Sequence, residues 1–123
     1  MSGHRITTDL LKADFDQADP GSGGSITAEG NWTVVELVSA GAEARSMKDP
    51  VKSGQLIVLT LKTHGGTVTV TAATAFNKAG NTTIAFDAAL ETVTLTSIPN
   101  GTSGYRWASG AAKSATDDTP TFG

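Results

Sequence analysis

Apolar and polar residues alternate along most of this chain. From Ser25 to Ser109, short runs rich in β-branched residues follow one another, and Gly, Pro and Asn residues separate them. A period of two is typical of β-strands that bury one face. The pattern predicts strands at residues 25–28, 31–38, 43–47, 55–63, 66–73, 81–86, 91–98 and 104–109.

Two of these runs indicate how the strands are covered. In GQLIVLTLKT, Ile57, Leu59 and Leu61 share one face, and the opposite face is also apolar near its start, which predicts a central strand. In TVTVT, Val68 and Val70 face one way and threonines face the other. This second pattern is typical of an antiparallel strand with one covered face.

The spacing of the runs predicts the fold class. Strands recur at roughly ten-residue intervals, and no segment between them is long enough for the helical crossovers of a parallel sheet. We therefore expect an all-β protein, a small antiparallel β-sandwich or barrel with an extended N-terminal arm and a polar C-terminal tail. A chain of 123 residues has room for one such core.

The two ends of the chain lack the alternation. Residues 1–24 are polar and end in DPGSGGS, which predicts an arm and a flexible joint; within them, Thr8 to Phe15 have the cap and the apolar spacing of a short helix. The β domain is expected at residues 25–114, and a polar tail at residues 115–123. Removing residues 1–24 should then leave a folded domain.

Composition narrows the functional classes. The formal net charge is -3, and Lys and Arg are scattered singly, which argues against nucleic-acid binding. No apolar run approaches the roughly 20 residues of a membrane span, and the first residues lack the pattern of a secretory signal. We expect synthesis in a cytoplasm and no membrane partner. The chain has no cysteine, which excludes disulfides and thiolate chemistry.

His64 lies in KTHGGTV, between two predicted strands. A metal site or a general base would need a nearby carboxylate, histidine or nucleophile, and the local sequence offers none. Gly65 and Gly66 can instead supply the positive φ angles of a hairpin turn. We interpret His64 as the shoulder of a β-hairpin.

The carboxylates of the chain could bind calcium or perform acid/base chemistry. Asp14 and Asp16 occupy the first and third places of a calcium-loop pattern, but Asp19 stands where that pattern requires glycine. We interpret this cluster as a solvated acidic arm. Four carboxylates of the β region are interpreted as solvated too, namely Glu36, Glu43, Asp87 and Glu91. The sequence therefore predicts no catalytic residue, no cofactor and no metal ion.

Two tryptophans leave two interpretations open. Trp32 and Trp107 could stack on sugar rings, with Tyr105 and Arg106 as further contacts from exposed loops. Each could equally close one end of the core or an interface, because small or polar residues border both.

One long stretch resembles a domain that recurs among tailed-phage virion proteins, including head decoration and head fibre proteins. It reads EARSMKDPVKSGQLIVLTLKTHGGTVTVTAATAFNKAGNTTIAFDAALETVTLTSI and is followed by YRWAS. The shared features are R-x-M-x-D-P ahead of G-Q, a strand ending in T-H-G-G, a threonine/valine strand, AGNTTIAF, ETVTLTSI and a last strand with tryptophan. The resemblance covers about residues 31–114 and departs from the family pattern at GYRWASGAAKS.

The resemblance implies a non-enzymatic structural protein of a bacteriophage virion. This would be a capsid decoration, or cement, protein that sits on the capsid surface as a homotrimer and stabilises the head. Its partner would be the major capsid protein. The arm lies outside the resemblance, and we hypothesise that it contacts the capsid through Arg5, Ile6, Leu10, Leu11 and Phe15.

The alternative is a head or tail fibre, or receptor-binding, module. Its exposed loops, with Trp32, Tyr105, Arg106 and Trp107, would then contact host surface glycans.

Overall fold

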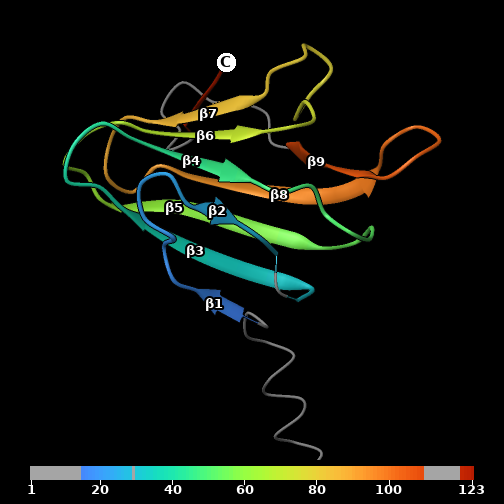
Figure 1. Cartoon of the computed structure of the whole chain (residues 1–123), viewed down its shortest axis with the longest axis horizontal. Coiled ribbons are helices and arrows are strands. Elements are labelled where there is room, and N and C mark those ends of the chain that lie inside the picture. Colours follow the sequence, from blue (N-terminus) through green and yellow to red (C-terminus); the bar gives the residue numbers. More distant parts are fainter. Residues whose placement is uncertain (1–14, 29, 110–119) are drawn as a thin grey trace, which may run out of the picture.

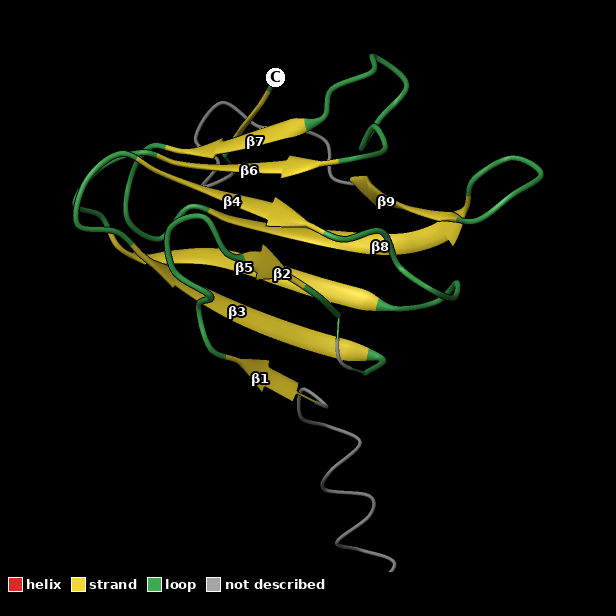
Figure 2. Cartoon of the chain, viewed as in Figure 1, coloured by secondary structure: helices red, strands yellow, loops and turns green. Residues whose placement is uncertain are grey.

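The protein is a sandwich of two five-stranded sheets (Figures 1 and 2). The computed structural model describes residues 15–28, 30–109 and 120–123, and these contain strands but no helix. The first sheet has the order β1 (Phe15–Gln17), β3 (Trp32–Val38), β5 (Leu56–Thr63), β8 (Thr92–Pro99) and β9 (Tyr105–Ser109). The second has the order β10 (Thr121–Phe122), β7 (Thr83–Phe86), β6 (Val68–Ala72), β4 (Glu43–Met47) and β2 (Ser25–Ile26).

The core lies between the facing surfaces of the two sheets. Alternate residues of each long strand point inward, so β5 buries Ile57, Leu59 and Leu61 while β6 buries Val68 and Val70. Fully burying an aliphatic side chain of this size contributes about 1.5–3 kcal/mol. Both predicted inward faces are confirmed, and β5 is the central strand of the first sheet.

The all-β sandwich is confirmed, but the predicted antiparallel pairing holds for only part of it. β3 pairs with β5, and β4 with β6, in parallel register, whereas β5–β8 and β6–β7 are antiparallel. The consecutive strands β3, β4, β5 and β6 alternate between the two sheets. A strand of the opposite sheet thus provides each crossover, so parallel neighbours need no helix.

All eight predicted strands are present, each within two residues of its expected ends. The sequence missed β1 and β10, which have three and two residues. Such short segments cannot display an alternating pattern. They are strands because β1 pairs with β3 and β10 pairs with β7.

The structure shifts both boundaries of the β domain. Residues 15–24, assigned above to the arm, form β1 and a loop that bonds to the rest of the domain. At the other end, Pro120 is buried and the carbonyl of Gly123 accepts hydrogen bonds from the amides of Thr82 and Thr83. The expected helix at residues 8–15 lies outside the described residues except for Phe15, which begins β1.

The strand directions sort the connections into two groups at opposite ends of the sandwich (Figure 1). We call one the loop end; it comprises residues 27–28, 30–31, 48–55, 73–82 and 100–104. We call the other the clamp end; it comprises residues 18–24, 39–42, 64–67 and 87–91. β1 runs parallel to β3, so Phe15 enters the sheet opposite Thr33, on the side of the loop end.

Candidate functional site

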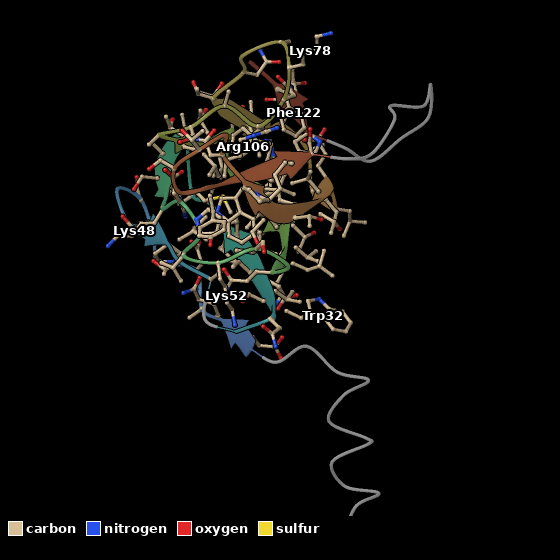
Figure 3. All side chains as sticks on the ribbon, turned by 90° about the vertical axis from the view of Figure 1, so that its right-hand side faces the viewer. Trp32, Lys48, Lys52, Lys78, Arg106 and Phe122 are labelled. Atoms are coloured by element: carbon tan, nitrogen blue, oxygen red, sulfur yellow. The ribbon has the colours of Figure 1, made fainter. Side chains whose placement is uncertain are left out.

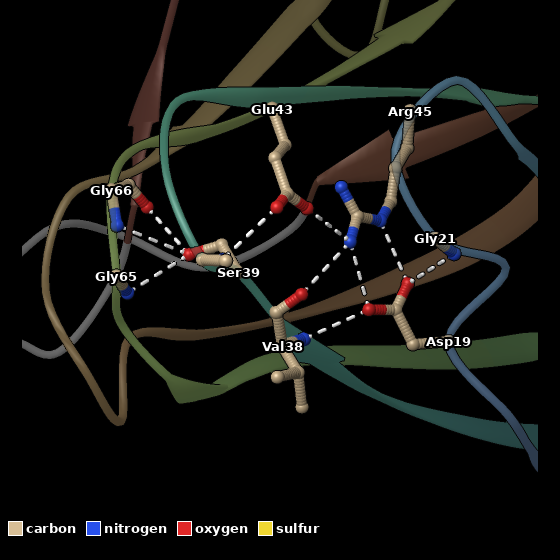
Figure 4. Close-up of polar contacts among 9 residues, drawn as sticks. Asp19, Gly21, Val38, Ser39, Glu43, Arg45, Gly65 and Gly66 are labelled. Atoms are coloured by element: carbon tan, nitrogen blue, oxygen red, sulfur yellow. Dashed lines mark hydrogen bonds and ion pairs between the residues drawn. The ribbon is translucent and has the colours of Figure 1, made fainter.

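A buried arginine is the centre of the polar structure at the clamp end (Figure 4). Arg45 occupies an inward position of β4, and its side chain is fully buried. The carboxylate of Asp19 accepts from Nε at 2.7 Å and from Nη2 at 2.8 Å. Nη2 also donates to Glu43 at 2.9 Å and to the carbonyl of Val38 at 3.0 Å. A buried charge is tolerated when it is paired and hydrogen-bonded in this way.

Asp19 connects three segments of the chain. Besides the guanidinium of Arg45, its carboxylate accepts from the amides of Val38 at 2.9 Å and Gly21 at 3.0 Å. The loop after β1 is thereby attached both to the end of β3 and to β4. We call the group of Asp19, Glu43 and Arg45 the clamp.

The clamp is charged at neutral pH. Partial burial tends to raise the pKa of Asp19, but hydrogen bonds from Arg45, Val38 and Gly21 outweigh this effect and hold its pKa below the ordinary value. A hydrogen bond from the amide of Ala40, followed by that of Arg45, lowers the pKa of Glu43. Hydrogen bonding to Asp19 raises the pKa of Arg45 despite its burial. The pKa shifts keep all three groups in their charged forms, and their hydrogen bonds hold the loop after β1 against β3 and β4.

The interpretation of Asp19 and Glu43 as solvated groups was therefore wrong. One local signal was available, because Arg45 alternates with the apolar Met47 and so falls on the inward face of its strand. A buried arginine requires carboxylate partners. The sequence gives no hint that Asp19, 26 residues away, is one of them.

The T-H-G-G segment does not form the expected hairpin. β5 and β6 belong to different sheets, and neither Gly65 nor Gly66 has a positive φ. Both glycines are needed for space, since a Cβ on Gly65 would lie 2.3 Å from the Ser39 carbonyl oxygen and one on Gly66 would lie 2.3 Å from a Gly41 backbone carbon. The Ser39 hydroxyl donates to the Gly66 carbonyl at 2.7 Å and accepts from both glycine amides.

The G-Q pair of the resemblance pattern also has a structural role. Gly54 has φ 85, a conformation that favours glycine. Gln55 is buried, its amide donates to the Ser97 hydroxyl at 2.7 Å, and its side-chain nitrogen donates to the Gly30 carbonyl at 2.8 Å. These contacts join the loop before β5 to β8 and to the start of β3.

The remaining polar candidates do not converge on a reactive centre. His64 and Glu36 are exposed, Glu36 as its outward strand position predicts. Glu91 accepts from the backbone amide of Asp87 at 2.6 Å, and the carboxylate of Asp87 accepts from the hydroxyl of Thr67 at 3.0 Å. No group of three His, Cys, Asp or Glu residues within the described ranges could hold a metal ion. Asp14 of the acidic arm lies outside those ranges, and Asp16 is exposed.

The two tryptophans have different surroundings. Trp107 is 1% exposed, and its Nε1 donates to the carbonyl of Lys48 at 2.9 Å. The core interpretation is therefore confirmed for Trp107, and its assignment as an exposed-loop contact was wrong. Trp32 is 36% exposed on the outward face of the first sheet. Tyr105 and Arg106 are half-buried.

The outward face of the first sheet is partly apolar around β3 and β5. Trp32 lies beside Leu56, which is 38% exposed, and Val34 lies beside Val58. Next to them is a hollow of about 320 Å³. It is lined by Asp16, Gln17, Val34 and Glu36. This face is exposed apolar surface with carboxylates at its β1 edge.

The predicted capsid contacts fall mostly beyond the described residues. Arg5, Ile6, Leu10 and Leu11 lie outside them, and Phe15 is the first residue of β1. The structure places the start of the described chain beside Trp32, whose neighbour Thr33 pairs with Phe15.

The loop end gathers side chains that are far apart in the sequence. Lys48, Lys52 and Lys78 are exposed there, and Figure 3 shows them projecting from this end of the molecule together with Trp32. Arg106, near the start of β9, donates from Nη1 to the carbonyl of Ala75 at 3.4 Å. Cations that are single in sequence thus share one end of the fold.

No helix of the described residues is long and apolar enough to cross a membrane. Comparison with protein-family models, curated proteins and solved structures finds no match for this chain.

Proposed function

We propose that the protein is a capsid decoration, or cement, protein of a tailed phage. It binds the assembled head as an oligomer, a trimer, and stabilises the head without catalysis. Its partner is the major capsid protein, and its place is the capsid surface. The resemblance over residues 31–114 supports this proposal, because it rests on several segments in a fixed order.

The observation that carries the proposal is how the root of the N-terminal arm is held. Phe15–Gln17 pair with β3, and Asp19 binds the buried Arg45. An arm that orders on a partner surface loses conformational entropy, but it can cover a large area. Because its root is fixed to the core, contacts made by residues 1–14 would hold the whole sandwich on the shell.

The polar groups of the described chain also favour a structural role. Asp19, Glu43 and Arg45 bond to one another, and the Ser39 hydroxyl bonds to two glycines. Catalysis requires a nucleophile or base whose hydrogen-bonding capacity is directed at a substrate. These groups direct theirs at the protein itself.

The test is deletion of residues 1–14, which leaves β1 and Asp19 in place. We expect the shortened chain to keep the circular dichroism spectrum and the number of chains per oligomer of the full chain, and to lose binding to undecorated heads in a co-sedimentation assay. Deletion of residues 1–24 is not a suitable test, since it also removes β1 and the carboxylate that pairs with Arg45.

The outcomes separate two errors. If the full chain does not bind heads, the proposed function is wrong. If the full chain binds and the shortened chain binds equally well, the function stands and the role of the arm is wrong.

The fibre or receptor-binding alternative keeps one observation in its favour, the exposure of Trp32. Stacking of a sugar on this ring would change its fluorescence. A glycan array, followed by fluorescence titration of the full chain and of Trp32→Phe, tests the alternative. A cement protein should give no response, whereas a glycan response that disappears in Trp32→Phe would favour the alternative.

A further inference from the structure

The loop end carries a local excess of positive charge. Lys48 and Lys52 belong to the connection between β4 and β5, Lys78 to the one between β6 and β7, and Arg106 to β9. Within its described connections this end has one carboxylate, Asp49, and the exposed Asp16 lies near it on β1. The chain as a whole has a net charge of -3. The positive charge at the loop end therefore means that charges of opposite sign are unevenly distributed over the molecule.

The clamp end has the opposite character. Its exposed or half-buried carboxylates include Asp87, Glu91 and Glu43, and Glu36 lies on β3 toward the same end. The exposed cation nearest to them is Lys62, close to the end of β5. A partner that approaches either end therefore meets a different sign of charge.

The lysines of the loop end are available to a partner. Both salt bridges of the described residues belong to Arg45, so neither uses Lys48, Lys52 or Lys78. The loops that carry them are also joined, because Thr74 donates to Asp49 at 3.0 Å. A fixed array of exposed cations can complement a fixed array of carboxylates.

We propose that the loop end is the surface by which the protein docks on an acidic protein surface of the assembled shell. Lys48, Lys52 and Lys78 face the carboxylates of the partner, and Trp32 adds an apolar contact at the rim. This inference rests on the proposed function and names the surface that performs it. The described chain begins near this end, because Phe15 enters the sheet opposite Thr33.

The arrangement favours a protein partner over a nucleic acid or an anionic glycan. The three lysines stand on two connections at the end of the sandwich, point in different directions in Figure 3, and do not form a stripe. A polyanion binds best where cations follow its evenly spaced charges.

The experiment compares charge reversals at the two ends. Lys52→Glu and Lys62→Glu change the net charge equally, but only Lys52 lies at the loop end. We expect Lys52→Glu to weaken binding to undecorated heads about threefold and Lys62→Glu to leave it unchanged. Reversal of Lys48, Lys52 and Lys78 together should weaken binding at least about tenfold and remove most of its dependence on NaCl.

Each result decides between explanations. All variants should first show the unfolding midpoint of the full chain. If the full chain binds heads and the triple variant binds as tightly as Lys62→Glu, the docking surface is wrong while the function stands. If the full chain fails to bind, the function itself is wrong. If the full chain is retained on heparin or duplex DNA and the triple variant is not, the surface belongs to a polyanion and the proposal is overturned.

Discussion

Arg45 is the residue whose position most constrains this fold. Its guanidinium sits among core side chains, and removing one partner of a buried ion pair leaves a charge without compensation. Asp19 supplies two of its hydrogen bonds, and Asp19 belongs to a segment that would otherwise be a free arm. One residue thus couples the stability of the core to the order of the N-terminal segment.

Asp19→Asn should therefore lower the free energy of unfolding by about 3 kcal/mol, since the amide retains the shape but not the charge. Urea denaturation followed by circular dichroism measures the change. Asp16→Asn is the matched control, because Asp16 is exposed on β1, and its effect should stay within about 0.5 kcal/mol. Equal effects of the two substitutions would contradict the role of the clamp.

The clamp also makes stability depend on pH in a defined direction. The pKa values of Asp19 and Glu43 are lower in the folded than in the unfolded protein, so the unfolded state binds more protons in acid. Their contribution to stability is complete above the unfolded pKa, at about pH 4, and is lost as the pH falls through the folded pKa. We expect urea midpoints to fall steeply below about pH 4 and less steeply in Asp19→Asn. Identical pH profiles would argue against Asp19 as a source of the effect.

At the scale of elements, the connections matter as much as the strands. The segment between β5 and β6 crosses the segment between β3 and β4 so closely that Gly65 and Gly66 have no room for side chains. This contact fixes where the chain passes from one sheet to the other. The hairpin interpretation of T-H-G-G identified glycines that matter, but it gave the wrong reason for them.

Gly66→Ala should destabilise the protein by about 1–3 kcal/mol, because its Cβ would meet backbone atoms of Gly41 and Ala42 that cannot move independently. Gly41→Ala is the control on the opposite segment, where an added Cβ meets nothing within 4 Å. Thermal unfolding of both variants makes the comparison. If Gly66→Ala unfolds no earlier than Gly41→Ala, the close approach is not a constraint in solution.

Strand positions could be predicted because alternation is local. Val68 and Val70 are buried and Thr71 is exposed, as the pattern of β6 alone implies. Strand partners could not be predicted, because a strand that alternates in this way fits either sheet. β1 and β10 are too short to show an alternating pattern. They form strands because they pair with the edges of β3 and β7.

At the scale of the whole molecule, surfaces of different chemical character lie on different sides of the sandwich. The outward face of the first sheet is partly apolar, the loop end is positive and the clamp end carries most of the described carboxylates. Exposed apolar patches on small proteins commonly mark contacts with other chains. The proposed oligomer is consistent with such a surface.

The proposed trimer has a testable mass. One chain has a mass of 12.5 kDa, and we expect light scattering coupled to size exclusion to give about three times this value for the full chain. After deletion of residues 1–14 the mass should still correspond to three of the shortened chains, because that segment is assigned to the shell. A mass of one chain over the whole concentration range would contradict the trimer.

The sequence by itself determined the fold class, eight of the strands and the buried sides of β5 and β6, because a period of two follows from the geometry of a single strand. Only the tertiary structure decided that Trp107 is buried while Trp32 is exposed, that Asp19 meets Arg45, and that single lysines share one end. These outcomes depend on which sheet each strand joins and in which direction it runs. The sheet that a strand joins and its direction depend on pairing with segments far apart in the chain. A local sequence pattern therefore cannot predict them.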